Sequence, residues 1–224
     1  MKRRQTKIWI ILAAILLTVI ATFIANQRLT QNLEANYGEN QEYYAMGEIV
    51  PFGENYQTIG FEDTVDGYSL RVNNAKILTW EDMLTYIGQS EEDAEALLGE
   101  GASTQPEKVC LVTITLWNDG SQAPGVDLSC LYCYGISYDL HMDTDLTILA
   151  NSFLLDAYRD QMADNHVGFV GVSLDPGEKV DVCLVYDYSK SNFTERHWDR
   201  LDEDRLWLDI TDFPIRKTIE LILR

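Results

Sequence analysis

The stretch VCLVTITLW, from Val109 to Trp117, decides the fold that the sequence predicts. Side chains in a β-strand point alternately to two faces, and here both faces are largely apolar. A strand that is apolar on both faces is normally covered on both, so this stretch predicts an inner strand of two stacked sheets. The polar triplet 118–120, Asn-Asp-Gly, follows at once and predicts a turn.

Similar runs lie on both sides of this strand. They are GYSLRV (67–72), LSCLYCYGISYDL (128–140), VGFVGVSL (167–174), KVDVCLVYDY (179–188), RLWLDIT (205–211) and KTIELIL (217–223). The residues 175–178, Asp-Pro-Gly-Glu, predict a type II turn and a hairpin between the third and fourth of these runs. Stretches 79–101 and 151–165 read as short helices. Short strands separated by turns predict a mainly β protein, an antiparallel β-sandwich with a short helical insert.

The N-terminus predicts a membrane anchor. Residues Ile8–Ala25 contain no charged residue over eighteen positions, and four Lys and Arg residues precede them within 2–7. Eighteen residues are about the shortest helix that crosses a bilayer at roughly 1.5 Å rise per residue. A bulky Phe23 disfavours cleavage after Ala25. The sequence therefore predicts a basic cytoplasmic segment at 1–7 and an uncleaved transmembrane helix at 8–25.

The rest of the chain is expected outside the membrane. Residues 26–55 are polar, contain glycines and a proline, and predict a flexible spacer. Residues 56–224 are long enough to form one hydrophobic core, and we expect them to be the extracytoplasmic β-sandwich domain. The predicted localisation is the cell membrane, with a single span, the N-terminus in the cytoplasm and the C-terminal domain extracellular.

The charge balance is strongly acidic. The chain has 36 Asp and Glu against 17 Lys and Arg, a formal net charge of −19. Such a domain repels the phosphates of nucleic acids and the headgroups of anionic lipids, so neither is an expected partner. The charge itself suits a dispersed, soluble domain.

Three segments carry a resemblance to a known group of proteins. They are LVTITLWNDGSQAPGVDLS (111–129), LDPGEKVDVCLVY (174–186) and LWLDITDFPIRKTIEL (206–221). Together they resemble uncharacterised exported proteins of Gram-positive bacteria. The resemblance implies an N-terminal membrane anchor and an immunoglobulin-like β-sandwich over about residues 60–224. It implies no catalytic residue, because it rests on turns and strands.

The four cysteines leave two readings open. They are Cys110, Cys130, Cys133 and Cys183. An exported domain permits disulfides, yet alternation along a strand points Cys130 and Cys133 to opposite faces. No helix begins at this Cys-x-x-Cys, which disfavours redox chemistry. The cysteines are therefore buried thiols, or two of them form one structural disulfide.

The segment DLHMDTD is the candidate metal site. It places Asp139, His141, Asp143 and Asp145 at alternate positions, which would share one face of a strand or converge in a loop. Oxygen ligands at such spacing suit Ca²⁺. The glycine and the closing glutamate of an EF-hand are missing, and a solvated edge or loop is the alternative.

The segment ERHWDRLDEDRLW (195–207) predicts a charged surface turn with weak ion pairs. We expect its two tryptophans, Trp198 and Trp207, to lie in the core.

No motif for hydrolysis, cofactor binding or a structural zinc site is present among the three histidines and the serines. The sequence therefore predicts no catalytic residue, no cofactor and no enzyme activity. It favours a membrane-anchored extracytoplasmic binding or accessory domain, with residues 79–101 and 118–127 as candidate surfaces for an extracellular ligand. One alternative is a structural subunit of a membrane transport or secretion complex, whose partner would be another membrane protein. The other is a cation-dependent envelope enzyme.

Overall fold

The computed structural model describes residues 40–55, 57, 65–92, 94, 106–121, 125–152 and 171–223. The chain divides into two compact units, Met1–Glu39 and Asn40–Arg224, and all described residues belong to the second. The predicted transmembrane helix at 8–25 lies outside the described residues. Within the part that is described, no helix is long and apolar enough to cross a membrane.

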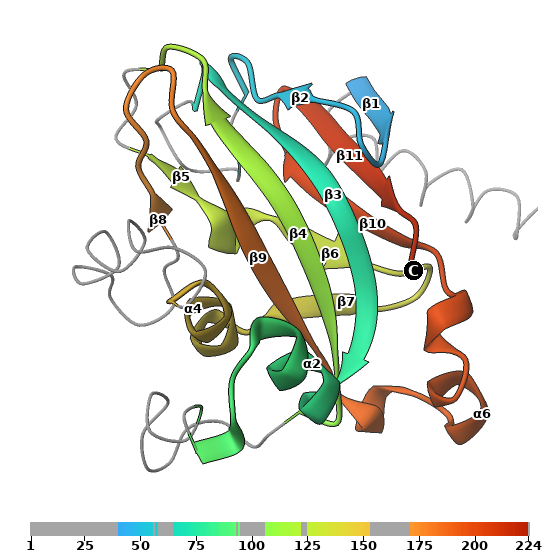
Figure 1. Cartoon of the computed structure of the whole chain (residues 1–224). Coiled ribbons are helices and arrows are strands. Elements are labelled where there is room, and N and C mark those ends of the chain that lie inside the picture. The colour runs from blue at the N-terminus through green and yellow to red at the C-terminus, as the bar shows by residue number, and fades with distance from the viewer. Residues whose placement is uncertain are drawn as a thin grey trace, which may run out of the picture. The chain divides into compact units, whose positions relative to one another are not determined.

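Nine of the described strands form one mixed sheet, in the order β1-β11-β10-β6-β7-β9-β4-β3-β2 (Figure 1). Their bounds are β1 Asn40–Ala45, β2 Val50–Pro51, β3 Tyr68–Thr79, β4 Lys108–Asn118, β6 Tyr132–Tyr134, β7 Asp139–Met142, β9 Lys179–Tyr188, β10 Leu206–Thr211 and β11 Ile215–Leu221. Neighbouring strands are antiparallel except β1 and β11, which are parallel. Two short strands, β5 (Val126–Asp127) and β8 (Gly171–Val172), pair separately.

The prediction of a mainly β protein is confirmed, whereas the immunoglobulin-like sandwich is not. A sandwich has two separate sheets. Here β7 pairs with β6 on one side and with β9 on the other, so hydrogen bonding continues through all nine strands. Strand periodicity indicates which residues are buried, but it does not indicate where one sheet ends and another begins.

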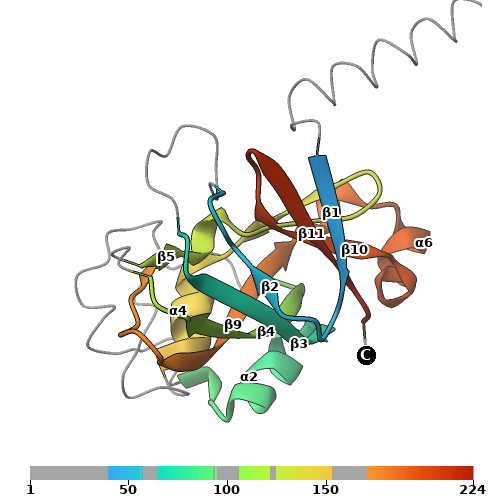
Figure 2. The same cartoon turned by 90° about the horizontal axis from the view of Figure 1, so that it is seen from above.

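The sheet curls until its two edges meet around a common core (Figure 2). Near one edge, Ala75 of β3 forms a parallel bridge with Leu223, just after β11. The Lys217 Nζ atom of β11 donates a hydrogen bond to the Pro51 carbonyl of β2 at 2.7 Å. The inner face of the curled sheet is apolar and includes Phe52, Leu70, Val112, Ile114, Leu116, Cys133, Leu184, Tyr186, Leu208 and Ile219.

Strand β4 is buried on both faces, as its sequence predicts, but helices cover the second face. Val109 and Leu111 pack in a second apolar cluster with Met83 and Leu84. These two come from α2 (Trp80–Ile87), and the same cluster includes residues of α4 (Thr144–Ser152). An apolar strand face fits a helix as well as a second sheet, which is why the sequence did not separate the two.

Helix α2 forms most of the described part of the predicted helical insert. Thr79 caps its N-terminus by accepting a hydrogen bond from the Asp82 backbone N–H at 3.2 Å. Gly88 ends it in the left-handed region at φ 72°, where glycine is unstrained. Ile87 is buried, whereas Tyr86 is 46% exposed with the Lys76 ammonium over its ring.

Helix α4 begins at Thr144, before the helix expected at 151–165, and of that stretch only residues 151 and 152 are described. Two of its buried polar side chains complete the edge of β9. The Asn151 side chain donates to the Cys183 carbonyl at 2.7 Å and accepts from the Cys183 N–H at 2.8 Å. The Thr147 hydroxyl accepts from the Val185 N–H at 3.0 Å. Strand β7 pairs only with the later part of β9, so these side chains take the place of a strand.

The turn at 175–178 is present, but the described residues before it do not form the predicted hairpin with β9. The Glu178 N–H donates to the Asp175 carbonyl at 2.9 Å, and Gly177 has φ 88°. However, β8 pairs with β5 and not with β9. The turn residues fix the direction of the chain locally, whereas strand pairing depends on the remainder of the sheet.

The domain begins earlier than the sequence predicted. Residues 40–55, expected in the flexible spacer, supply β1 and β2, and the side chains of Val50 and Phe52 are 0% exposed. β1 lies at an edge of the sheet and most of its side chains are exposed, so it lacks the apolar alternation of a covered strand. The rest of the predicted spacer, 26–39, lies outside the described residues.

None of the four cysteines, all of which are described and buried, forms a disulfide. Cys110 and Cys133 belong to the inner core, and Cys183 belongs to the cluster beneath the helices. Burial raises the pKa of the Cys183 thiol to about 11, with a smaller effect from Asp181. Burial also raises the pKa of Cys133, which hydrogen-bonds to Cys110.

Candidate functional site

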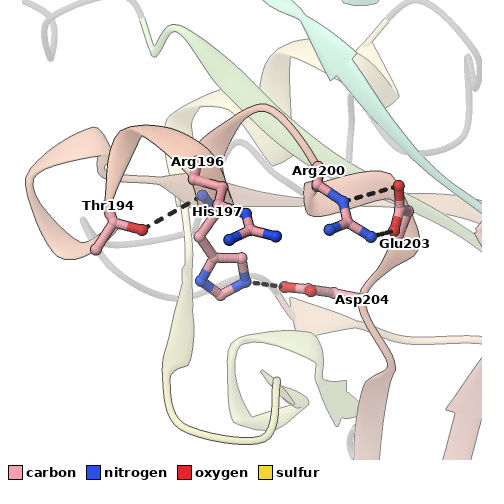
Figure 3. Close-up of a pocket in the computed structure, with 6 residues that line it drawn as sticks. All are labelled: Thr194, Arg196, His197, Arg200, Glu203 and Asp204. Carbon is pink, nitrogen blue, oxygen red and sulfur yellow. Dashed lines mark hydrogen bonds and ion pairs between the residues drawn. The ribbon is translucent and has the colours of Figure 1, made fainter.

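A polar pocket lies in the connection between β9 and β10 (Figure 3). This connection contains three short helical turns: η2 (Lys190–Asn192), α6 (Glu195–Trp198) and η3 (Leu201–Glu203). The cavity has a volume of about 400 Å³ and opens to solvent. It is lined by Thr194, Arg196, His197, Arg200, Glu203 and Asp204.

Two apolar side chains attach this connection to the core. Trp198 is 5% exposed and Leu201 is 1% exposed, and both belong to the inner cluster. Phe193 packs edge-on against Tyr138 with ring centroids 4.9 Å apart. Thr194 caps α6 by accepting a hydrogen bond from the His197 N–H at 3.3 Å. Because the apolar residues point inward, the charged residues between them point into the pocket.

Asp204 holds the imidazole of His197 in place. The His197 Nε2 atom lies 2.8 Å from Asp204 Oδ2. Tyr138 follows β6 in the sequence. Its hydroxyl donates a hydrogen bond to the same Asp204 oxygen at 2.6 Å. Burial raises the pKa of Tyr138 well above its ordinary value, and the hydrogen bond to Asp204 raises it further. Tyr138 therefore stays a neutral donor, and the carboxylate has two partners.

Glu203 is paired with the guanidinium of Arg200. The Arg200 Nε atom donates to Glu203 Oε1 at 3.0 Å, and a second contact joins the other nitrogen and oxygen. The hydrogen bond raises the pKa of Arg200 and lowers the pKa of Glu203. Both side chains are exposed, so the pair positions charge and contributes little to stability.

Arg196 differs from the other charged residues of the pocket. Neither a hydrogen bond nor an ion pair joins its guanidinium to another described residue. Figure 3 shows this guanidinium between His197 and Arg200. A guanidinium offers a rigid fork of donors that matches a carboxylate or a phosphate. Arg196 therefore offers its whole guanidinium to a ligand, whereas two nitrogens of Arg200 are already engaged by Glu203.

The residues predicted as a metal site do not come together. Asp139 and His141 are exposed on β7. Asp143 accepts a hydrogen bond from the Leu146 N–H at 2.9 Å at the start of α4, and Asp145 lies in the first turn of that helix. Among the described residues, no group of three or more His, Cys, Asp or Glu side chains could hold a metal ion. The segment changes from strand to helix at Asp143, so alternate residues no longer share a face.

The two tryptophans of the 195–207 segment have different environments. Trp198 lies in the core, as expected. Trp207 lies outside the core. Its ring stacks on the ring of Tyr134, with the two centroids 5.7 Å apart, and the guanidinium of Arg205 lies over the Trp207 ring. The inner face of β10 is taken by Leu206 and Leu208, which places Trp207 on the outer face.

Sequence reasoning missed the pocket because it treated this segment as a surface turn. The charged residues, Arg196 and Arg200 among them, were weighed only as solvent-exposed ion pairs. The available signals were Thr194, a residue type suited to capping the short helix that follows, and the spacing of the two arginines. The contact of Asp204 with Tyr138, 66 residues away, has no signal in either segment.

The fold and the pocket together define an acidic, mainly β domain with an open polar cavity at one connection of its sheet. The chain belongs to the family that carries a domain of unknown function, DUF5028, whose model matches residues 41–217. The matched segment begins within β1, in agreement with a domain that starts near Asn40. No curated protein and no solved structure shows a significant match to the chain.

Proposed function

We propose that this protein is a membrane-anchored, extracytoplasmic binding or accessory domain of Gram-positive bacteria. Its ligand binds in the pocket between β9 and β10. The observation that carries this proposal is Arg196, whose guanidinium faces the pocket and has no partner among the described residues. A guanidinium at a cavity offers charge-assisted hydrogen bonds to an anionic ligand, and this favours a binding site.

The pocket chemistry favours binding over catalysis. Thr194 supplies the one hydroxyl among its six lining residues, and its oxygen caps α6. The His197 Nε2 atom is directed at Asp204 rather than at a nucleophile. General-base catalysis needs a base within hydrogen-bond reach of the proton that it removes. This pocket instead presents the guanidinium of Arg196 as a donor.

The sequence supports the anchored location. Residues Ile8–Ala25 are uncharged and follow a basic segment, and positive charge is retained on the cytoplasmic side of a membrane. The domain that follows begins near Asn40.

The test is a gentle detergent purification of the full chain from its native membranes, read by intact mass spectrometry. We expect the mass to include residues 8–25 and the chain to partition with the membrane. A mature chain that starts near Asn26 would show a secreted protein and contradict the anchor. A defined membrane-protein partner in fixed proportion would favour the alternative, a structural subunit of a transport or secretion complex.

A further inference from the structure

We propose that the pocket between β9 and β10 binds a single carboxylate group, held by the guanidinium of Arg196. This inference rests on the proposed binding function and names the chemical class of the ligand. It assigns the carboxylate to the C-terminal end of a peptide, because Thr194 lines the same pocket and can donate to the backbone carbonyl that precedes such a carboxylate.

The geometry of the pocket leaves the guanidinium of Arg196 open to a ligand. Asp204 is engaged by His197 and by Tyr138, at 2.8 and 2.6 Å. Arg200 is engaged by Glu203. These pairs fix the walls of the cavity, and the Arg196 guanidinium lies between them (Figure 3). A carboxylate placed against Arg196 receives two parallel N–H···O hydrogen bonds, the strongest arrangement that this side chain offers.

The charge of the pocket selects a monoanion. Its two arginines are balanced by Glu203 and Asp204, so the formal charge is zero when His197 is neutral. One bound carboxylate adds a single negative charge. That charge lies next to the guanidinium of Arg196, which has no partner among the described residues. A phosphate dianion would bring a second negative charge next to two fixed carboxylates. A polyanion would also meet the field of a chain with net charge −19.

Thr194 supplies a second donor at the edge of the same cavity. Its oxygen accepts the capping hydrogen bond from the His197 N–H, which leaves the hydroxyl proton able to point toward a ligand. A peptide end carries a carboxylate and, one residue earlier, a backbone carbonyl. The Arg196 fork suits the first group and the Thr194 hydroxyl suits the second.

The test compares two dipeptides on the full chain in detergent. N-acetyl-alanyl-alanine carries a free carboxylate, and its C-terminal amide is the same size but neutral. Ligand-observed NMR measures weak binding of both, and inorganic phosphate is titrated separately. We expect the free acid to bind at least about tenfold more tightly than the amide or phosphate, because a charge-assisted hydrogen bond is lost in the amide.

Substitutions of Arg196 test whether the ligand binds in this pocket. Arg196→Gln should lower binding of the free acid at least about tenfold, and Arg196→Lys should restore part of it because the charge returns without the fork. Arg71→Gln is the matched control, since Arg71 lies on β3 over the ring of Trp117 and outside the pocket. Arg196 is exposed and has no partner among the described residues, so its variants should fold, and circular dichroism checks this.

Three results would overturn the proposal: equal binding of acid and amide, tighter binding of phosphate than of the acid, or equal losses for Arg196→Gln and Arg71→Gln. Failure of every probe to bind would overturn it as well. These outcomes do not depend on the result of the detergent purification that tests the membrane anchor. A chain that stays in the membrane but ignores carboxylates keeps its anchored location and loses only this ligand class.

Discussion

Asp187, on β9, has a buried carboxylate oxygen, Oδ1, with no hydrogen-bond partner among the described residues. Burial raises the pKa of Asp187, the neighbouring Asp143 raises it further, and His141 lowers it. The folded state therefore holds the proton more tightly than the unfolded state does. The stability that protonation provides is present below the ordinary pKa of 3.8 and is lost as pH rises through the folded value.

The prediction that follows is that Asp187→Asn stabilises the protein at pH 7. The amide removes a charge from a poorly solvated position. Because the residue is only half-buried, we expect a gain of up to about 1 kcal/mol, or roughly 2–4 °C in Tm. Thermal unfolding followed by circular dichroism measures it, and the gain should shrink as pH falls toward 3.8. Asp139→Asn, exposed on β7, should give no gain. An equal gain in both variants would contradict the role of burial.

At the scale of the element, α4 acts as a substitute strand. Its Asn151 satisfies both the N–H and the carbonyl of Cys183, and all the atoms involved are buried. A backbone group without a partner in such a place is costly. The hydrogen bonds that a neighbouring strand would make with this part of β9 are thus supplied by an amide side chain on a helix.

Asn151→Ala should therefore destabilise the protein. Two buried backbone groups lose their partners, which we expect to cost about 2–4 kcal/mol in the free energy of unfolding. Urea denaturation measures this cost from the shift of the midpoint at constant slope. Asp145→Ala, exposed in the first turn of the same helix, serves as the control and should change stability by less than about 1 kcal/mol. A loss below that level in Asn151→Ala would show that water satisfies the β9 edge.

At the scale of the whole molecule, the domain boundary at Asn40 is testable by truncation. A fragment of residues 40–224 keeps β1 and β2 and should fold with the same secondary structure as the full chain. A fragment of residues 56–224, which starts where the sequence placed the domain, lacks the buried Val50 and Phe52. It also exposes the β11 edge that β1 covers.

The shorter fragment should consequently lose cooperative thermal unfolding, since removing one large buried side chain alone costs about 3–5 kcal/mol. Circular dichroism and calorimetry on the two fragments decide the matter. If the 56–224 fragment unfolds in a sharp transition at the same temperature as the 40–224 fragment, β1 and β2 are not needed for folding and this prediction is wrong.

How much the sequence predicts also depends on scale. The alternation in Val109–Trp117 correctly predicts a strand buried on both faces, because burial is a local pattern. β1 was missed because an edge strand with exposed side chains has no such pattern. The pocket was missed because Tyr138 and Asp204 meet only when β6 and β10 pair. Periodicity reports which side of an element is apolar, but it does not report which distant element lies there.

The parallel pairing of β1 with β11 sets an order of events during biosynthesis. Of the described strands, β1 leaves the ribosome first and β11 leaves last, yet Tyr43 of the one lies opposite Thr218 of the other. Closing a loop between such distant residues is slow, and it cannot start before residues 215–221 have been made. Any translocation step that accompanies synthesis therefore acts on a chain whose sheet is still open.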